Sequence, residues 1–182
     1  LVLGPGSVVG HHLINDPRVD MVSFTGGLNT GQTIMKAAVS TVKRLALELG
    51  GKNPHIIFAD ADIDAAIDNA VTAAFLHSGQ VCSAGTRLIV ERSIHDRVVK
   101  EIVRRAGQIR LGGPEDLTAE TGPLISKSHL EGVTKYVEKG IAEGATLLVG
   151  GKRSESSEHA NGWYYLPTVL DNCNTKMFCV QD

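Results

Sequence analysis

Residues 79–87 read Gly-Gln-Val-Cys-Ser-Ala-Gly-Thr-Arg and place one cysteine, Cys82, in a short loop bounded by glycines. The loop follows an apolar run with helical spacing at residues 62–76 and precedes a strand-like run. Upstream, residues 45–52 form another strand-like run that carries one carboxylate, Glu48, before a pair of glycines. A thiol between glycines and an acid in an apolar strand suggest covalent catalysis, with a nucleophile and a separate base.

Together, these two stretches resemble the aldehyde dehydrogenase superfamily, in which the first supplies the catalytic cysteine and the second the catalytic glutamate. The separation of Cys82 and Glu48, 82 − 48 = 34 residues, also fits the family. Residues 24–27, 77–85 and 173–177 look most like the betaine-aldehyde branch of the family. The resemblance covers essentially the whole chain.

The resemblance implies an α/β fold of the aldehyde dehydrogenase type. Residues 1–50 would form the C-terminal part of a Rossmann-type, NAD(P)-binding domain, and residues 51–182 the first part of an α/β catalytic domain. The chain opens in a strand-like run at residues 1–3 and stops just short of the family's Phe-Gly-Pro element, so we expect a fragment of a longer chain. We expect the isolated segment to be inactive, because the family carries further cofactor and oxyanion groups elsewhere.

The implied reaction is NAD(P)-dependent oxidation of an aldehyde to the carboxylic acid. The thiolate of Cys82 would attack the carbonyl carbon, and the thiohemiacetal would pass a hydride to the nicotinamide. Water activated by Glu48 would then hydrolyse the thioester. Betaine aldehyde is the substrate that the branch suggests. Its quaternary ammonium group would need an aromatic box, and the sequence does not locate one.

Each proposed catalytic residue has a structural alternative. A cysteine is commonly a buried, inert residue, which is how we interpret Cys173 and Cys179. Cys82 differs because a glycine-bounded loop can supply the backbone N–H groups that a thiolate and an oxyanion need. A carboxylate on an apolar strand is costly to bury unless it has a task or a partner. The alternative for Glu48 is an outward-facing position, because it alternates with Leu47 and Leu49.

A glycine turn joins a strand-like run at residues 19–24 to a helix expected over residues 30–39. This arrangement points backbone N–H groups at an anion. Residues 24–27 also resemble the family's Phe-Thr-Gly-Ser element near the cofactor pyrophosphate, while a plain glycine helix cap is the alternative. The cofactor is NAD, with NADP as the alternative. The predicted cofactor contacts are Gly26, Gly27, Leu28, Asn29 and Gly50.

Hydrophobic periodicity predicts the remaining elements. An earlier glycine turn, at Gly4, Gly6 and Gly10, is one residue too long for the usual dinucleotide fingerprint. Asp60 and Asp62 are the candidate N-caps for the helix that follows them. Strands are expected at residues 1–3, 42–49, 53–58 and 88–90, and helices at residues 7–14, 62–76, 94–109 and 127–143.

The composition excludes several functional classes. Of 182 residues, 42% are hydrophobic and 21% charged, as in ordinary soluble proteins. A net charge of −2 gives no basic field for nucleic acid or an anionic membrane. Three cysteines do not form a disulfide framework, which favours the reducing cytoplasm. We expect no metal site, a small-molecule aldehyde as partner, and, from the resemblance, a homo-oligomer (dimer or tetramer).

Two other functions compete with the dehydrogenase hypothesis. The chain could belong to a non-catalytic binding or structural relative, although retention of Cys82 and Glu48 weighs against it. It could also belong to a thiol acyltransferase or hydrolase, which would need a histidine partner such as His77. That hypothesis leaves the Glu48 stretch and the glycine turns unexplained.

Overall fold

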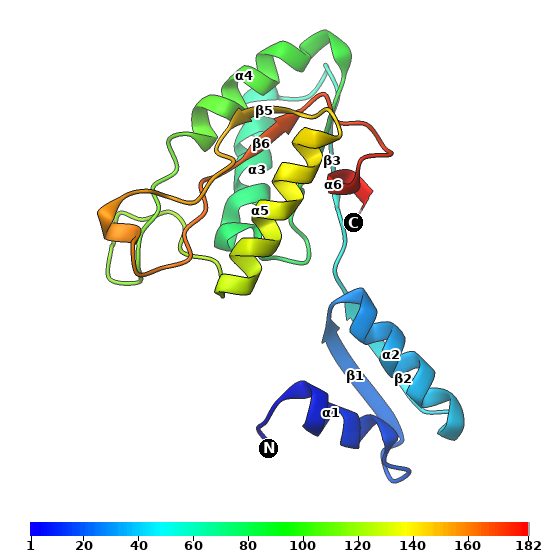
Figure 1. Ribbon diagram of the computed structural model, residues 1–182. Helices are drawn as coiled ribbons and strands as arrows, with labels where there is room; N and C mark the ends of the chain where they lie inside the picture. Colours follow the sequence, from blue (N-terminus) through cyan, green and yellow to red (C-terminus); the bar gives the residue numbers. More distant parts are fainter. Residues whose placement is uncertain (182) are drawn as a thin grey trace. The chain divides into compact units, whose positions relative to one another are not determined.

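The computed structural model divides the chain into two units, Leu1–Gly51 and Lys52–Asp182 (Figure 1). The structure describes residues 1–181, so Asp182, the last residue of the predicted catalytic part, lies outside the described residues. Helices alternate with parallel strands in the first unit and in the first part of the second, as an α/β fold requires. The predicted fold class is confirmed.

The first unit is built on two parallel strands, β1 (Met21–Gly26) and β2 (Arg44–Leu49). Helix α1 (Gly6–Asn15) precedes them, and helix α2 (Leu28–Ala38) connects them and buries Ile34 and Ala38. Gly31 allows α2 to approach β2 closely: a Cβ there would lie 2.8 Å from the Leu49 side chain, which would have to move. The buried Lys43 fixes the start of β2 by donating to the carbonyl oxygens of Asp16 and Val19, at 2.6 Å each.

The second unit begins with two parallel strands, β3 (Pro54–Ile57) and β4 (Arg87–Val90). Helices α3 (Ile63–Phe75) and α4 (His95–Ala106) pack with them around a core that includes Ile57, Ile67 and Val98. The Asp62 carboxylate accepts from the Ala65 N–H at 3.2 Å, so the predicted N-cap is confirmed. The unit continues with α5 (Lys127–Ala142), an antiparallel pair of β5 (Thr146–Val149) and β6 (Val169–Asp171), and α6 (Phe178–Gln181).

Several predicted elements differ from the structure. Strand β1 and the start of helix α2 are each shifted by two residues from the ranges 19–24 and 30–39. Residues 1–3 form no strand and their side chains are exposed; an apolar run becomes a strand only where another strand pairs with it, and none does so among residues 1–181. Strand β2 starts at Arg44 instead of residue 42, because Val42 has a left-handed backbone with φ 51°. Helix α4 ends at Ala106 instead of residue 109, because the chain turns at Gly107.

Candidate active site

Cys82 lies in the loop between α3 and β4, and its thiol is free and exposed. The backbone of the loop is held by Asn53, whose side-chain nitrogen lies 2.6 Å from the Cys82 carbonyl oxygen and 3.3 Å from that of Ala84. Among residues 1–181 no hydrogen-bond acceptor faces the Cys82 backbone N–H. The loop therefore presents a thiol and a free N–H donor together, which suits a nucleophile that generates an oxyanion.

The segment before Cys82 is held from the opposite side. The Ser78 N–H donates to the Thr121 hydroxyl oxygen at 2.8 Å, and the Ser78 hydroxyl donates to the Gly122 carbonyl oxygen at 2.7 Å. The Gln80 side-chain oxygen accepts from the Ile125 N–H at 3.1 Å. These bonds fix the loop to a segment about 40 residues further along the chain (121 − 82 = 39).

Glu48 lies on β2 opposite Thr25 of β1, and its side chain is exposed, while Leu47 and Leu49 are half-buried. Within the described residues the Glu48 side chain faces outward, which is the structural alternative to a buried catalytic carboxylate. It belongs to the first unit and Cys82 to the second. The structure does not bring the two side chains together within one unit.

The five predicted cofactor contacts lie at one end of the first unit. Gly26 ends β1, Gly27 is the N-cap of α2, and Leu28 and Asn29 form its first turn. The Gly50 N–H donates to the Gly26 carbonyl oxygen at 3.3 Å, which brings the two glycine turns together. The first-turn N–H groups of α2 have no side-chain cap, and a Cβ on Gly27 or Gly50 would meet no atom within 4 Å. An open helix N-terminus of this kind suits a phosphate group.

The profile described as "Aldehyde dehydrogenase family" matches residues 1–182. The chain belongs to the aldehyde dehydrogenase family. It is 55% identical over its whole length to the betaine aldehyde dehydrogenase of Bacillus subtilis. Crystal structures of the Staphylococcus aureus betaine aldehyde dehydrogenase in complex with NAD⁺ share 47% identity and a TM-score of 0.98 over the entire chain. The chain spans 37% of the B. subtilis relative and 36–37% of these S. aureus chains.

These similarities confirm the predicted membership of the aldehyde dehydrogenase family. They name the betaine-aldehyde branch that residues 24–27, 77–85 and 173–177 suggested. The structural match also confirms the aldehyde dehydrogenase-like fold, because the alignment with a TM-score of 0.98 covers 100% of the chain.

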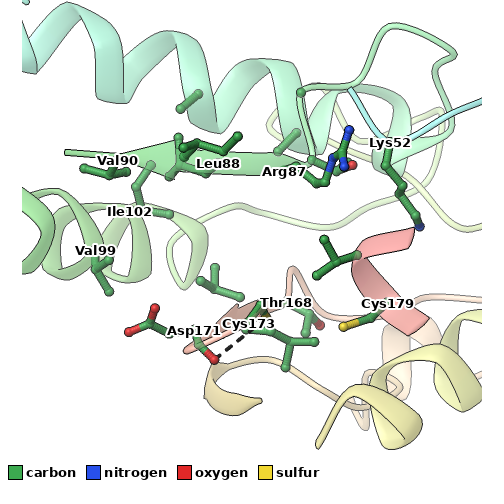
Figure 2. Close-up of a pocket in the computed structure, with 18 of the residues that line it drawn as sticks. Lys52, Arg87, Leu88, Val90, Val99, Ile102, Thr168, Asp171, Cys173 and Cys179 are labelled. Atoms are coloured by element: carbon green, nitrogen blue, oxygen red, sulfur yellow. Dashed lines mark hydrogen bonds between the residues drawn. The ribbon is translucent and has the colours of Figure 1, made fainter. Parts of the chain in front are cut away.

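The second unit of this family member also contains a cavity of about 830 Å³ (Figure 2). Its polar lining includes Lys52, Arg87, Cys173 and Cys179, and Cys82 is not part of it. Cys173 is exposed, so the buried position predicted for it is wrong. Partial burial of its thiol and the neighbouring Cys179 nevertheless raise its pKa to about 11. Its sulfur lies 3.8 Å from the Asp171 carbonyl oxygen. A thiol held protonated at neutral pH is a poor nucleophile, so Cys173 is not a rival to Cys82.

The sequence analysis missed four residues that hold the Cys82 loop. These residues are Asn53, Ser78, Gln80 and Thr121. Ser78 and Gln80 lie in the stretch that carried the family resemblance, and Asn53 follows directly after the Gly-Gly-Lys of the glutamate motif. The sequence could have indicated these residues only as polar side chains close to a glycine-bounded loop. Their hydrogen-bond partners depend on the fold and could not be predicted from the local sequence.

Two further observations concern the residues that the structure describes, 1–181. No helix there combines the length and apolar character needed to cross a membrane. No cluster of three or more His, Cys, Asp or Glu side chains there could hold a metal ion.

Proposed function

We propose that the protein carrying this chain oxidises an aldehyde to the carboxylic acid, with NAD as hydride acceptor. Membership of the aldehyde dehydrogenase family and the NAD⁺ complexes of the S. aureus relative support the proposal. The single observation that carries it is the Cys82 loop, an exposed thiol on a backbone fixed by Asn53 on one side and by Ser78 on the other.

In this proposal Cys82 is the nucleophile. Its thiolate forms a carbon–sulfur bond to the aldehyde carbon, and the carbonyl oxygen becomes an oxyanion that the Cys82 backbone N–H stabilises. Bound NAD accepts the hydride from that carbon, which leaves a thioester on Cys82. Another S. aureus structure of the same relative carries a BME-modified cysteine, and this reactivity supports a thiol nucleophile.

Glu48 is the proposed general base of the second half-reaction. It takes a proton from water, the resulting hydroxide attacks the thioester carbon, and the carbon–sulfur bond breaks to release the carboxylic acid and the Cys82 thiolate. This role requires the Glu48 carboxylate of the first unit to lie near the thioester on Cys82 in the full-length protein. Residues 1–50 are accordingly proposed as the C-terminal part of the NAD-binding domain and residues 51–182 as the first part of the catalytic domain.

The proposed cofactor contacts are backbone groups around the two glycine turns. Gly26, Gly27, Leu28 and Asn29 would hold the pyrophosphate at the N-terminus of α2, and Gly50 would lie near the nicotinamide. The open space at Gly27 and Gly50 and the uncapped first turn fit such a group. NADP is the alternative cofactor.

Betaine aldehyde is the proposed substrate, because both the B. subtilis and the S. aureus relatives are betaine aldehyde dehydrogenases. We further propose a homo-oligomer, a dimer or tetramer, located in the cytoplasm. The three free cysteines of the structure are compatible with a reducing compartment.

The proposal is tested by the absorbance of reduced nicotinamide with the full-length protein, NAD and a panel of aldehydes that includes betaine aldehyde. We expect turnover with betaine aldehyde and its loss in Cys82→Ala. A wild-type protein that is silent with the whole panel, while Cys82 still reacts with a thiol probe, would support the non-catalytic alternative instead.

A further inference from the structure

Three successive residues before Gln80 adopt left-handed backbone conformations. The φ angles are 50° at His77, 59° at Ser78 and 73° at Gly79. Glycine tolerates this region, but the Cβ of His77 and of Ser78 makes it unfavourable. Such a conformation persists only where neighbouring groups hold it. The loop that carries Cys82 therefore begins in a strained segment, which neighbouring groups must hold in place.

Thr121 makes the contacts that bridge this segment. Its hydroxyl oxygen accepts from the Ser78 N–H at 2.8 Å, and its hydroxyl donates to the carbonyl oxygen of Phe75, the last residue of α3, at 3.3 Å. The Ser78 hydroxyl lies 3.1 Å from the Thr121 hydroxyl and donates to the Gly122 carbonyl oxygen at 2.7 Å. One threonine side chain thus connects the end of a helix to the left-handed residue after it.

The backbone of Thr121 is itself firmly fixed. The N–H groups of Glu120 and Thr121 donate to the Arg110 carbonyl oxygen at 2.9 and 3.3 Å, and the Gly112 N–H donates to the Thr121 carbonyl oxygen at 3.1 Å. These bonds tie Thr121 to the segment that follows α4. The hydroxyl of Thr121 is therefore a fixed point against which the Cys82 loop is held.

We infer that Thr121 is a positioning residue for Cys82, acting through Ser78. The inference rests on the proposed function, in which Cys82 is the nucleophile. The thiol is exposed, so few side chains restrain it and the backbone of its loop decides where its sulfur lies. A displacement of about 1 Å from an attacking geometry can cost on the order of 10²-fold in rate. Thr121 belongs to the second unit and the predicted cofactor residues to the first, so its loss should lower kcat and leave NAD binding unchanged.

The experiment compares three variants of the full-length protein. Thr121→Val removes the hydroxyl at nearly constant shape, and Thr121→Ser keeps the hydroxyl. Thr134→Val is the matched control, because the Thr134 hydroxyl also donates to a backbone carbonyl, that of Leu130 at 2.8 Å, but within α5. Two quantities are measured: the steady-state constants with aldehyde and NAD, and the alkylation rate of Cys82 by iodoacetamide, resolved by peptide mass spectrometry.

We expect Thr121→Val to lower kcat by about tenfold or more, with the KM for NAD within about twofold of wild type. The alkylation rate of Cys82 should also change, because a released loop no longer holds the exposed thiol in one position. Thr121→Ser should restore both rates, and Thr134→Val should change neither. Wild-type kcat in Thr121→Val, or equal impairment of the Val and Ser variants, would overturn the inference.

The two readouts separate this inference from the proposed function. A wild-type protein that oxidises no aldehyde contradicts the proposed function. The alkylation rates then test the role of Thr121 alone. An unchanged alkylation rate of Cys82 in Thr121→Val overturns that role. Should Thr121→Val fail to fold, Ser78→Ala is measured in its place and judged by the same criteria. It removes the hydroxyl that lies 3.1 Å from the Thr121 hydroxyl and donates to the Gly122 carbonyl oxygen.

Discussion

The side-chain amide nitrogen of Asn53 lies 2.6 Å from the carbonyl oxygen of Cys82. The same nitrogen lies 3.3 Å from the Ala84 carbonyl oxygen, and the Asn53 carbonyl oxygen accepts from the Arg87 N–H at 3.1 Å. Asn53 therefore fastens the cysteine loop to the start of β3, five residues after Glu48 (53 − 48 = 5). One amide side chain therefore joins the cysteine loop to the residue that directly follows the glutamate stretch.

Replacing Asn53 by aspartate tests this contact. Asn53→Asp keeps the shape but places a carboxylate oxygen against two carbonyl oxygens, so the loop should shift. We expect kcat to fall by about 10- to 100-fold and unfolding to be easier by about 1–3 kcal/mol. Both are measured on the full-length protein, by reduced-nicotinamide absorbance and urea denaturation. The control is Asn69→Asp on the exposed face of α3. Equal kcat in the two variants would refute a role for Asn53 in the loop.

The raised pKa of Cys173 predicts a difference between the thiols. Burial is the largest cause of its shift to about 11. Because alkylation requires the thiolate, Cys173 should react slowly with iodoacetamide at neutral pH, and its rate should still be rising above about pH 9. Cys82 and Cys173 are both exposed, so accessibility does not distinguish them, and the raised pKa of Cys173 is the reason to expect Cys82 to be modified first. Peptide mass spectrometry over a pH series measures both. Early modification of Cys173 at neutral pH would contradict the prediction.

His95 should make stability depend on pH. Its side chain lies 2.9 Å from a carboxylate oxygen of Asp96 and 3.2 Å from one of Asp171, and these hydrogen bonds, that with Asp96 first, raise its pKa. A folded-state pKa above the unfolded value of ~6.5 means that the stabilisation is fully present below ~6.5 and lost as pH rises through the folded pKa.

The measurement for His95 is urea denaturation of wild type and His95→Gln at about pH 6 and about pH 9. We expect the variant to be less stable than wild type at the lower pH and the difference to shrink at the higher pH. Added salt should also reduce the difference, because Asp96 is fully exposed. A difference that grows with pH would show that the ion pairs of His95 do not stabilise the fold.

The sequence predicted what is local. Glycines and helical periodicity located α2, α3 and α5 to within two residues at most boundaries, and Asp62 was identified as an N-cap. The end of α4 was placed three residues too late, because the run continues to look amphipathic beyond Gly107. Residues 1–3 form no strand because no other described strand pairs with them. An apolar run alone does not reveal whether such a partner exists.

The candidate site rests on a different kind of signal. The roles of Cys82 and Glu48 come from residue types and spacing, and they stay predictions. The contacts of the Cys82 loop were not found, because the Ser78–Thr121 bond joins residues 43 positions apart. The left-handed backbone of His77 and Ser78 was equally hidden, since a positive φ is uncommon for residues other than glycine.

The most direct test of the account is to trap the covalent intermediate on Cys82. In full-length Glu48→Gln, supplied with aldehyde and NAD, hydride transfer should proceed once and hydrolysis should stall. The account predicts about one equivalent of reduced nicotinamide per site and an acyl group on the peptide that carries Cys82, found by mass spectrometry. Sustained wild-type turnover by the variant would remove Glu48 as the base. A single turnover with the acyl group on any other residue would contradict Cys82 as the nucleophile.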